Sequence, residues 1–253
     1  MKQDKRTAFI LAAGLGTRLK ELTRNTPKAL VSINKKPLLE VILEELIRQG
    51  FNHIVVNIHH FGEQIMGFLE DFTTKLHSGR NDGTLIEISD ERTLLMDTGG
   101  AILQALPLFS QSEAVLVHNV DVLTNVDLQG LYNDFLHSDD AAWLLTQERQ
   151  SKRKLVFDNH DNFLGRFNVE NECFDGGCTL PNDCKLLSFS GIHIFKPQFF
   201  KDFDKNPCYI FELYQKIAEN HRVKSELIHP DYWFDLGTIE QLKNAEQWLS
   251  LRR

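Results

Sequence analysis

The sequence predicts an α/β fold, a Rossmann-like and doubly wound sheet of mostly parallel strands in three layers. Apolar runs of strand length recur along the chain, and those at 7–13, 53–59 and 114–119 are almost continuously hydrophobic. Such runs are typical of parallel strands that are covered on both faces. Segments with helical spacing lie between the runs, and this alternation indicates right-handed crossovers within one sheet.

The remaining elements follow from their own local patterns. Three further strands are expected on their apolar runs, at 84–89, 141–146 and 186–195. In the helix expected at 36–50, Pro37 suits the first turn and Gly50 suits the end. Helices are also expected at 98–109, 209–220 and 238–251. The last of these begins with Thr238 and Gln241 at the spacing of a capping box.

The bulk composition limits the class of protein. With 253 residues, of which 42% are hydrophobic, the chain can bury a sizeable core. A net charge of −7 with no visible basic face argues against a nucleic-acid-binding protein. No apolar run reaches about 18 residues, so no membrane span is expected. The charged start is interpreted as the approach to a core strand rather than a signal peptide, and the protein is expected to be cytoplasmic.

The four cysteines do not form the C-x-x-C pairs of zinc sites; they are Cys173, Cys178, Cys184 and Cys208. Reduced cysteines in a cytoplasmic protein are the expectation. The clustering of three cysteines within 173–184 leaves an adventitious metal or a disulfide open.

The whole chain, 1–253, is interpreted as a single domain because no internal repeat, low-complexity tract or linker is visible. The stretch 147–187 differs from the rest, being polar and rich in Asn and Asp. Irregular strands and loops are expected there, forming a flap over one side of the site.

The first strand leads into a glycine-rich loop, with Gly14 and Gly16 followed by Thr17 and Arg18. Backbone N–H groups in such a loop can donate hydrogen bonds to phosphate oxygens, and Arg18 adds a planar, permanent positive charge. The pattern is neither the dinucleotide G-x-G-x-x-G nor a Walker A loop. Taken alone, it fits a phosphate-binding loop and an ordinary tight turn about equally.

The segment 14–40 closely resembles the N-terminal signature of the sugar-phosphate nucleotidyltransferases. The residues that match this signature are Gly14, Gly16, Thr17, Arg18, Leu19, Leu22, Thr23, Pro27, Lys28, Leu30 and Pro37. Glu21 stands where the family usually has Pro. The resemblance implies a nucleotide-diphospho-sugar transferase-like fold, in which Arg18 and Lys28 hold the nucleoside triphosphate and neutralise the transition state.

Further family motifs extend the implied nucleotide site along the chain. Asn57 lies at a strand end, and Thr98, Gly99 and Gly100 match a loop that lets the nucleobase or ribose approach. The implied nucleotide-binding set is completed by the strand-end residues Leu11, Ala12, Ala13 and Asn119. His59 and His60 are adjacent, which is poor geometry for a metal, so a structural role is expected.

The resemblance also implies a metal and a sugar side. Asp121 and Asp235, each at a strand-end turn, would bind Mg²⁺ together with phosphate oxygens. Gly191 would allow close approach of the sugar, and Glu170 lies in a loosely matching stretch on the sugar side.

The implied reaction transfers a nucleoside monophosphate from a nucleoside triphosphate to a sugar 1-phosphate, giving an NDP-sugar and pyrophosphate. The short length resembles the compact uridylyltransferase and guanylyltransferase members. The expected partners are these two small substrates, with no nucleic acid or membrane, and the protein is expected to be a monomer or small homo-oligomer.

Two other functions remain open at this point. Val120 replaces the usual Gly before Asp121, which allows a catalytically weak, nucleotide- or sugar-binding regulatory member. A nucleotide-sugar-dependent glycosyltransferase ranks lower, because the segment 121–127 lacks an Asp-x-Asp pair.

Overall fold

The computed structural model describes residues 5–78, 83–175 and 179–251. The chain divides into two compact units. The first comprises Met1–Leu95, His118–Gln129 and Pro230–Arg253, and the second comprises Met96–Val117 and Gly130–His229. Each unit contains strands that pair with one another and its own buried apolar side chains. The expectation of a single domain over 1–253 stays a prediction.

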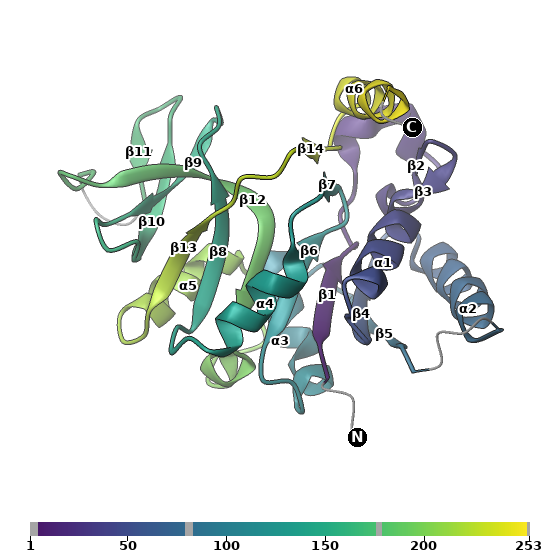
Figure 1. Cartoon of the computed structure of the whole chain (residues 1–253), viewed down its shortest axis with the longest axis horizontal. Coiled ribbons are helices and arrows are strands. Elements are labelled where there is room, and N and C mark those ends of the chain that lie inside the picture. The colour runs from purple at the N-terminus through teal and green to yellow at the C-terminus, as the bar shows by residue number, and fades with distance from the viewer. Residues whose placement is uncertain (1–4, 79–82, 176–178, 252–253) are drawn as a thin grey trace. The chain divides into compact units, whose positions relative to one another are not determined.

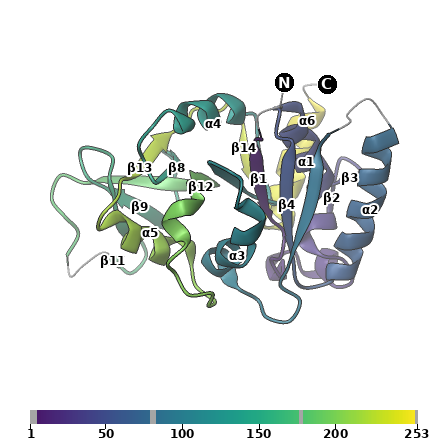
Figure 2. The same ribbon diagram turned by 90° about the horizontal axis from the view of Figure 1, so that it is seen from below.

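The first unit is built on three parallel strands, β1 (Thr7–Leu11), β4 (His53–Ile58) and β5 (Leu85–Asp90). Every residue of β4 is buried, including the polar His53 and Asn57. Figure 1 and Figure 2 show α1 (Leu38–Arg48) and α2 (Gly62–Ser78) alongside these strands. The strands expected at 7–13, 53–59 and 84–89 are confirmed.

Short elements complete the first unit. The helix expected at 36–50 is confirmed as α1, but Pro37 lies one residue before it, at the end of β3 (Lys36–Pro37), which pairs with β2 (Ser32–Ile33). Two 3-10 helices precede them, η1 (Thr17–Thr23) and η2 (Lys28–Leu30). Near the end of the chain, β14 (Trp233–Asp235) pairs with β7 (Val122–Thr124), antiparallel.

The C-terminal helix α6 (Ile239–Ser250) begins as its sequence predicts. The Thr238 Oγ1 accepts a hydrogen bond from the N–H of Gln241 at 3.3 Å and donates to Oε1 of the same residue at 3.0 Å. This satisfies a backbone donor that the first turn would otherwise leave unpaired.

The second unit contains a mixed sheet. Its strands are β8 (Ala142–Gln147), β9 (Arg153–Phe157), β10 (Phe163–Asn168), β11 (Cys173–Phe174), β12 (Lys185–Phe195) and β13 (Val223–Leu227). They run in the order β11-β10-β9-β12-β8-β13, and only the β8–β13 pair is parallel. The stretch 147–187, expected to be irregular, therefore contains a paired hairpin, because β9 and β10 are joined by a short turn.

The remaining helices and one further strand lie in the second unit or where the chain passes between the units. The second unit contains α3 (Asp97–Ala105), α5 (Ile210–Ala218), η3 (Leu106–Phe109) and η4 (Pro197–Phe200). The elements β6 (Val115–Asn119) and α4 (Leu128–Leu136) lie where the chain passes from one unit to the other.

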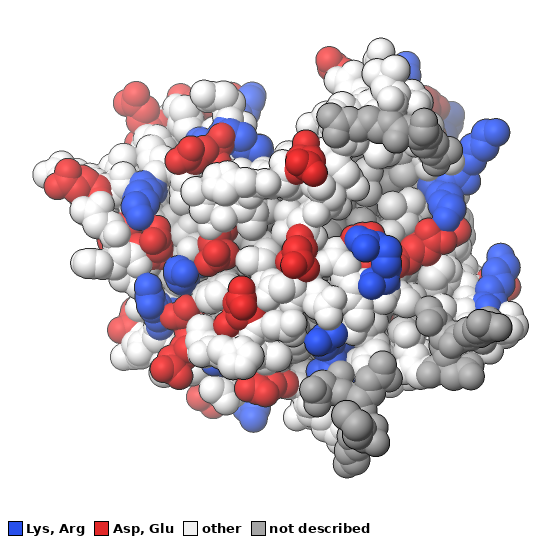
Figure 3. All heavy atoms as spheres, in the orientation of Figure 1, with Lys and Arg blue, Asp and Glu red and all other residues white. Residues whose placement is uncertain are grey.

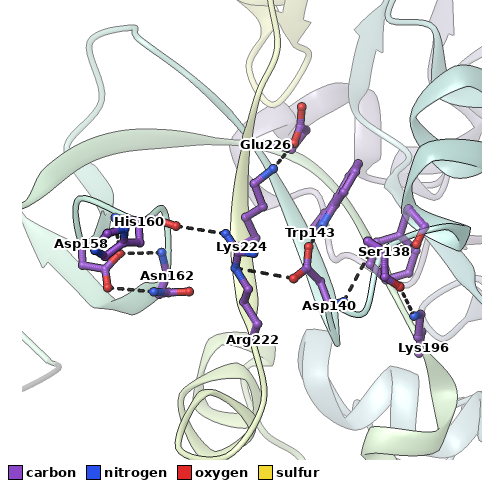
Figure 4. A network of polar contacts seen from close by, with 11 residues as sticks. Ser138, Asp140, Trp143, Asp158, His160, Asn162, Lys196, Arg222, Lys224 and Glu226 are labelled. Carbon is purple, nitrogen blue, oxygen red and sulfur yellow. Dashed lines mark hydrogen bonds and ion pairs between the residues drawn. The ribbon is translucent and has the colours of Figure 1, made fainter.

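A polar network fixes three segments of the second unit (Figure 4). The guanidinium of Arg222 lies 3.5 Å from Asp140 Oδ1 and donates to the carbonyl of His160 at 3.2 Å. The Trp143 indole donates to Asp140 Oδ2 at 2.5 Å. The ammonium of Lys224 lies over the Trp143 ring, 4.9 Å from its centroid. Asp140 is thus a nearly buried carboxyl with two partners, as a buried charge requires.

The described residues contain no helix that is long and apolar enough to span a membrane. Within the same residues, Cys173, Cys184 and Cys208 are free thiols. Cys178 lies outside the described residues. Figure 3 shows basic and acidic side chains interspersed on one face of the molecule.

We predict that His193 makes the second unit sensitive to acid. Its ring is buried among Phe189, Phe195 and Tyr214, and no described residue gives its nitrogens a hydrogen-bond partner. Burial lowers the pKa of His193 from 6.5 to about 3. The unfolded chain therefore takes up a proton below about pH 6.5 that the folded chain does not, so stability falls as the pH drops from there towards 3.

Replacing His193 by Leu removes this linkage. In urea unfolding, the stability of His193→Leu relative to the wild type should rise by about 3 kcal/mol between pH 7 and pH 4.5. The matched control is His229→Leu, at an exposed position of the same unit, for which the difference should stay constant. Parallel pH profiles for His193→Leu and the wild type would contradict the prediction.

Candidate functional site

The glycine-rich loop follows β1, and its first residues are hydrogen-bonded to the side chain of Asn57. The N–H groups of Ala12 and Ala13 donate to Asn57 Oδ1 at 2.6 and 3.1 Å. Gly16 has a φ of +64°, a conformation that glycine adopts without steric cost, and its carbonyl accepts from Thr23 Oγ1 at 3.0 Å. The N–H groups of Ala12 and Ala13 are therefore already hydrogen-bonded within the protein. The N–H groups of residues 14–18 follow them along the loop.

Lys28 and Asp121 meet in the first unit although they are 93 residues apart. Lys28 begins η2 directly after Pro27, and Asp121 lies in the turn between β6 and β7. The Lys28 ammonium forms an ion pair with Asp121 Oδ2, and the two side chains are only 11% and 15% exposed. A cation and an anion, both largely removed from water, thus lie together at the end of a strand.

Asp235 and Arg18 lie at the adjoining turn. Asp235 is paired in register with Val122, and the N–H of Leu236 donates to the Asp121 carbonyl at 2.7 Å. Asp235 Oδ1 accepts from the N–H of Gly237 at 2.8 Å. A Cβ added at Gly237 would lie 2.5 Å from Arg18 Nη2, so the guanidinium rests against this glycine. The four residues predicted to be catalytic therefore belong to one connected set in the first unit.

The two aspartates offer oxygen donors of the kind that a hard divalent cation prefers. In the contacts described above each carboxylate uses one oxygen, Oδ2 of Asp121 and Oδ1 of Asp235. No group of three or more His, Cys, Asp or Glu side chains arranged for a metal occurs among the described residues. The donor set therefore fits a metal with open coordination positions, not a closed structural site.

Hydrogen bonds of the residues before Asp121 fix the position of its turn. The N–H of Val120 donates to the carbonyl of Leu11 at 3.2 Å, which ties this turn to the end of β1. The Asn119 carbonyl accepts from His118 Nδ1 at 2.8 Å. Burial lowers the pKa of His118 to about 4, although Asp121 nearby favours the charged ring. His118 is therefore neutral at pH 7 and adds no charge to the site.

The adjacent histidines have structural contacts. His59 Nδ1 donates to the Glu91 carbonyl at 2.7 Å, and the His60 ring lies 4.0 Å from the ring of Phe61. Glu91 itself, which the sequence analysis did not single out, is a buried carboxyl directly after β5. Its place directly after a strand end was the signal available.

In the second unit, the Thr-Gly-Gly motif opens α3. The N–H groups of Gly99 and Gly100 donate to the Cys208 carbonyl at 2.8 and 3.2 Å, and Thr98 Oγ1 accepts from the N–H of Ile210 at 3.2 Å. A Cβ on either glycine would collide with the segment 206–209. The glycines permit this close packing, and their role in nucleobase binding stays a prediction.

The two residues expected on the sugar side differ in setting. Gly191 is buried in β12 with a φ of +83°, between Phe189 and His193, where the register of the β8–β12 pair shifts. Glu170 is exposed and forms an ion pair with Lys152 at 2.7 Å. Their contact with a sugar stays a prediction.

Comparisons with known proteins agree on the class of enzyme. A family model described as "Nucleotidyl transferase" matches residues 7–154. N-acetylmuramate alpha-1-phosphate uridylyltransferase of Caulobacter vibrioides is 32% identical over 99% of both chains. D-glycero-alpha-D-manno-heptose 1-phosphate guanylyltransferase of Campylobacter jejuni is 30% identical over 92% of this chain and 95% of its own.

Solved structures support the fold. UDP-glucose pyrophosphorylase from Acinetobacter baumanii superposes with a TM-score of 0.75 at 16% identity, over 98% of this chain and 94% of that one. The α/β fold class predicted from the sequence, a mostly parallel sheet with helices on both sides, is confirmed.

We predict that the two loop glycines differ in their tolerance of a side chain. An alanine Cβ at Gly16 would lie 2.9 Å from Thr23 Cγ2 and 3.0 Å from Lys28 Cβ, at a positive φ. Gly16→Ala should therefore lower the free energy of unfolding by about 2 kcal/mol. No described atom lies within 4 Å of a Cβ at Gly14, so Gly14→Ala should change it by less than about 0.5 kcal/mol.

Urea unfolding of both variants checks this prediction. Equal losses for Gly14→Ala and Gly16→Ala would show that the described loop conformation is not the one in solution.

Proposed function

The chain belongs to the nucleotidyl transferase family, and from this premise we propose how its residues transfer a nucleoside monophosphate from a nucleoside triphosphate to a sugar 1-phosphate. An oxygen of the sugar phosphate forms a bond to the α-phosphorus of the triphosphate. The bond from that phosphorus to the bridging oxygen breaks, and pyrophosphate leaves. The protein therefore needs to position two anions and offset their charge, without a covalent nucleophile of its own.

The observation that carries this proposal is the Lys28–Asp121 ion pair beside the glycine-rich loop. A largely buried ion pair costs desolvation and is a poor way to gain stability. Its residues are instead suited to the reaction: the ammonium of Lys28 offsets negative charge that develops around the α-phosphate. The pair keeps this cation in place before the substrates arrive.

The loop and Arg18 hold the leaving group. The N–H groups of residues 14–18 point the positive ends of their dipoles at the β- and γ-phosphates, since those of Ala12 and Ala13 are engaged by Asn57. Arg18 contributes a planar, permanently charged donor that suits phosphate oxygens. Thr98, Gly99 and Gly100 are assigned to the nucleobase side, and Gly191 and Glu170 to the sugar side.

The family generally uses a divalent metal, and we assign Mg²⁺ to this protein. Asp121 and Asp235 would hold it, and it would supply positive charge that offsets the negative charge of the substrate phosphates. The cytoplasm, where nucleoside triphosphates and reduced thiols are found, is the proposed compartment.

A substrate panel tests the proposed reaction. The protein with Mg²⁺ is incubated with each of four nucleoside triphosphates and several sugar 1-phosphates, and pyrophosphate is measured. Release with one pair is expected. If triphosphate binds by calorimetry but no pair turns over, the protein is a binding member, the alternative that Val120 raises.

We predict that Lys28→Ala lowers kcat/KM by about 100-fold or more, because a preorganised charge at the reacting phosphate is lost. The control is Lys36→Ala. Lys36 lies on the same unit, is 49% exposed, and pairs only on the surface with Glu40 and Glu44. It should retain wild-type kcat/KM. An unchanged value for Lys28→Ala would remove this residue from the site.

We predict that EDTA abolishes turnover and that MgCl₂ restores it. Asp235→Asn should then need at least about tenfold more Mg²⁺ for half-maximal rate, because it removes one of two carboxylate charges. Asp231→Asn serves as the control, since the exposed Asp231 contacts Asn125 at 2.9 Å and lies four residues away. Full turnover in EDTA would refute the metal requirement.

A further inference from the structure

Glu91 is the most buried carboxyl group at the strand ends of the first unit. It follows β5 directly and is 2% exposed, whereas Asp90 before it is exposed and pairs with Arg92. The backbone of Glu91 is anchored to β4, since its N–H donates to the Ile58 carbonyl at 2.9 Å. A buried carboxyl is costly unless its oxygens have hydrogen-bond partners, so Glu91 is expected to hold a neighbouring donor group.

The side chain of Glu91 sets the orientation of the Asn57 amide. Glu91 Oε1 accepts a hydrogen bond from Asn57 Nδ2 at 2.8 Å, and Asn57 is 3% exposed. An amide has one donor end and one acceptor end, so this bond turns Asn57 Oδ1 to the opposite side. There it accepts from the N–H groups of Ala12 and Ala13 at the start of the glycine-rich loop.

A flipped amide would be incompatible with the loop. It would place the Nδ2 donor of Asn57 against the two N–H donors of Ala12 and Ala13 and leave three buried donors unpaired. An unpaired buried donor is strongly unfavourable, because its hydrogen bond to water is lost and not replaced. Glu91 therefore decides between two orientations of Asn57 that differ little in shape but greatly in what they offer the loop.

We propose that Glu91 is a positioning residue for nucleoside triphosphate binding. Through Asn57 it fixes the path of residues 12–13, and thereby the direction of the N–H groups of residues 14–18 that receive the phosphates. This inference rests on the proposed function of the loop. Glu91 does not touch the substrate, and its effect is confined to the triphosphate side of the reaction.

The hydrogen bonds from Glu91 through Asn57 to the loop form a relay, meaning a chain of hydrogen-bonded groups. A second relay crosses the same strands and provides an internal comparison. Glu87, four residues earlier on β5, has its Oε2 2.7 Å from His53 Nε2, and His53 Nδ1 lies 3.0 Å from Thr7 Oγ1. Like the Glu91 relay, it runs from β5 through β4 towards β1. It ends on a side chain of β1 rather than on the loop, so its contacts join the three strands and do not reach the loop.

The test compares Glu91→Met, Glu91→Gln and the control Glu87→Met. Met removes the acceptor at similar size, and Gln keeps an oxygen that Asn57 can donate to. For Glu91→Met we expect the Kd and KM of the triphosphate to rise at least about tenfold, with the KM of the sugar 1-phosphate changed less than about twofold. Glu91→Gln should restore most of the triphosphate affinity.

The control separates positioning from folding. Glu87→Met should lower the thermal midpoint while leaving the triphosphate KM within about twofold of the wild type. If Glu91→Met does not fold, Glu91→Asp replaces it, since the shorter side chain withdraws the carboxyl from Asn57. In an Asn57→Ala background, the Glu91 substitution should cause little further loss of triphosphate affinity.

Two results would overturn the proposal. One is a triphosphate Kd for folded Glu91→Met or Glu91→Asp equal to that of the wild type. The other is an equal rise in both KM values, as a general loss of structure would cause. Failure of the proposed function looks different, because the wild type itself would then neither bind triphosphate nor release pyrophosphate.

Discussion

The parallel register of β1, β4 and β5 is the constraint on which the site depends. Parallel strands place their carboxyl ends at one edge of the sheet, where open α/β sheets bind ligands. The glycine-rich loop follows β1, Asn57 stands near the end of β4, and Glu91 follows β5. Segments of the chain 34 to 45 residues apart are therefore close enough for hydrogen bonds.

The proposed site concentrates positive charge on a protein that is acidic overall. The net charge is −7, yet Arg18 and Lys28 stand together with the loop at one edge of the first unit. Each side chain is positioned by a different contact. Lys28 is held by the Asp121 carboxylate, and Arg18 rests where Gly237 has no side chain. Under the proposed function, this local placement outweighs the overall charge over the short distances of a phosphate contact.

Much of the fold and part of the site could be predicted from the sequence. Continuous apolar runs identified the parallel strands, and Thr238 identified the start of α6. Asp121 and Asp235 were predicted from their strand-end positions and from family resemblance, and the structure joins their turns. The catalytic and binding roles themselves stay predictions.

What could not be predicted depends on partners that are distant in sequence. The Asn57 amide faces the loop because of Glu91, which no local pattern links to it. Gly99 and Gly100 look like a ligand loop, yet their N–H groups meet the Cys208 carbonyl. The stretch 147–187 is polar, and its strands β9 and β10 become evident only through their pairing with each other.

Labelled phosphates show directly which phosphorus atom of the triphosphate is attacked. The protein is incubated with its sugar 1-phosphate and with nucleoside triphosphate labelled at either the α- or the γ-phosphate. Attack at the α-phosphorus predicts that the α label enters the sugar product and that the γ label leaves in pyrophosphate. A γ label in the sugar product, or an α label released as free nucleoside monophosphate, would contradict the account.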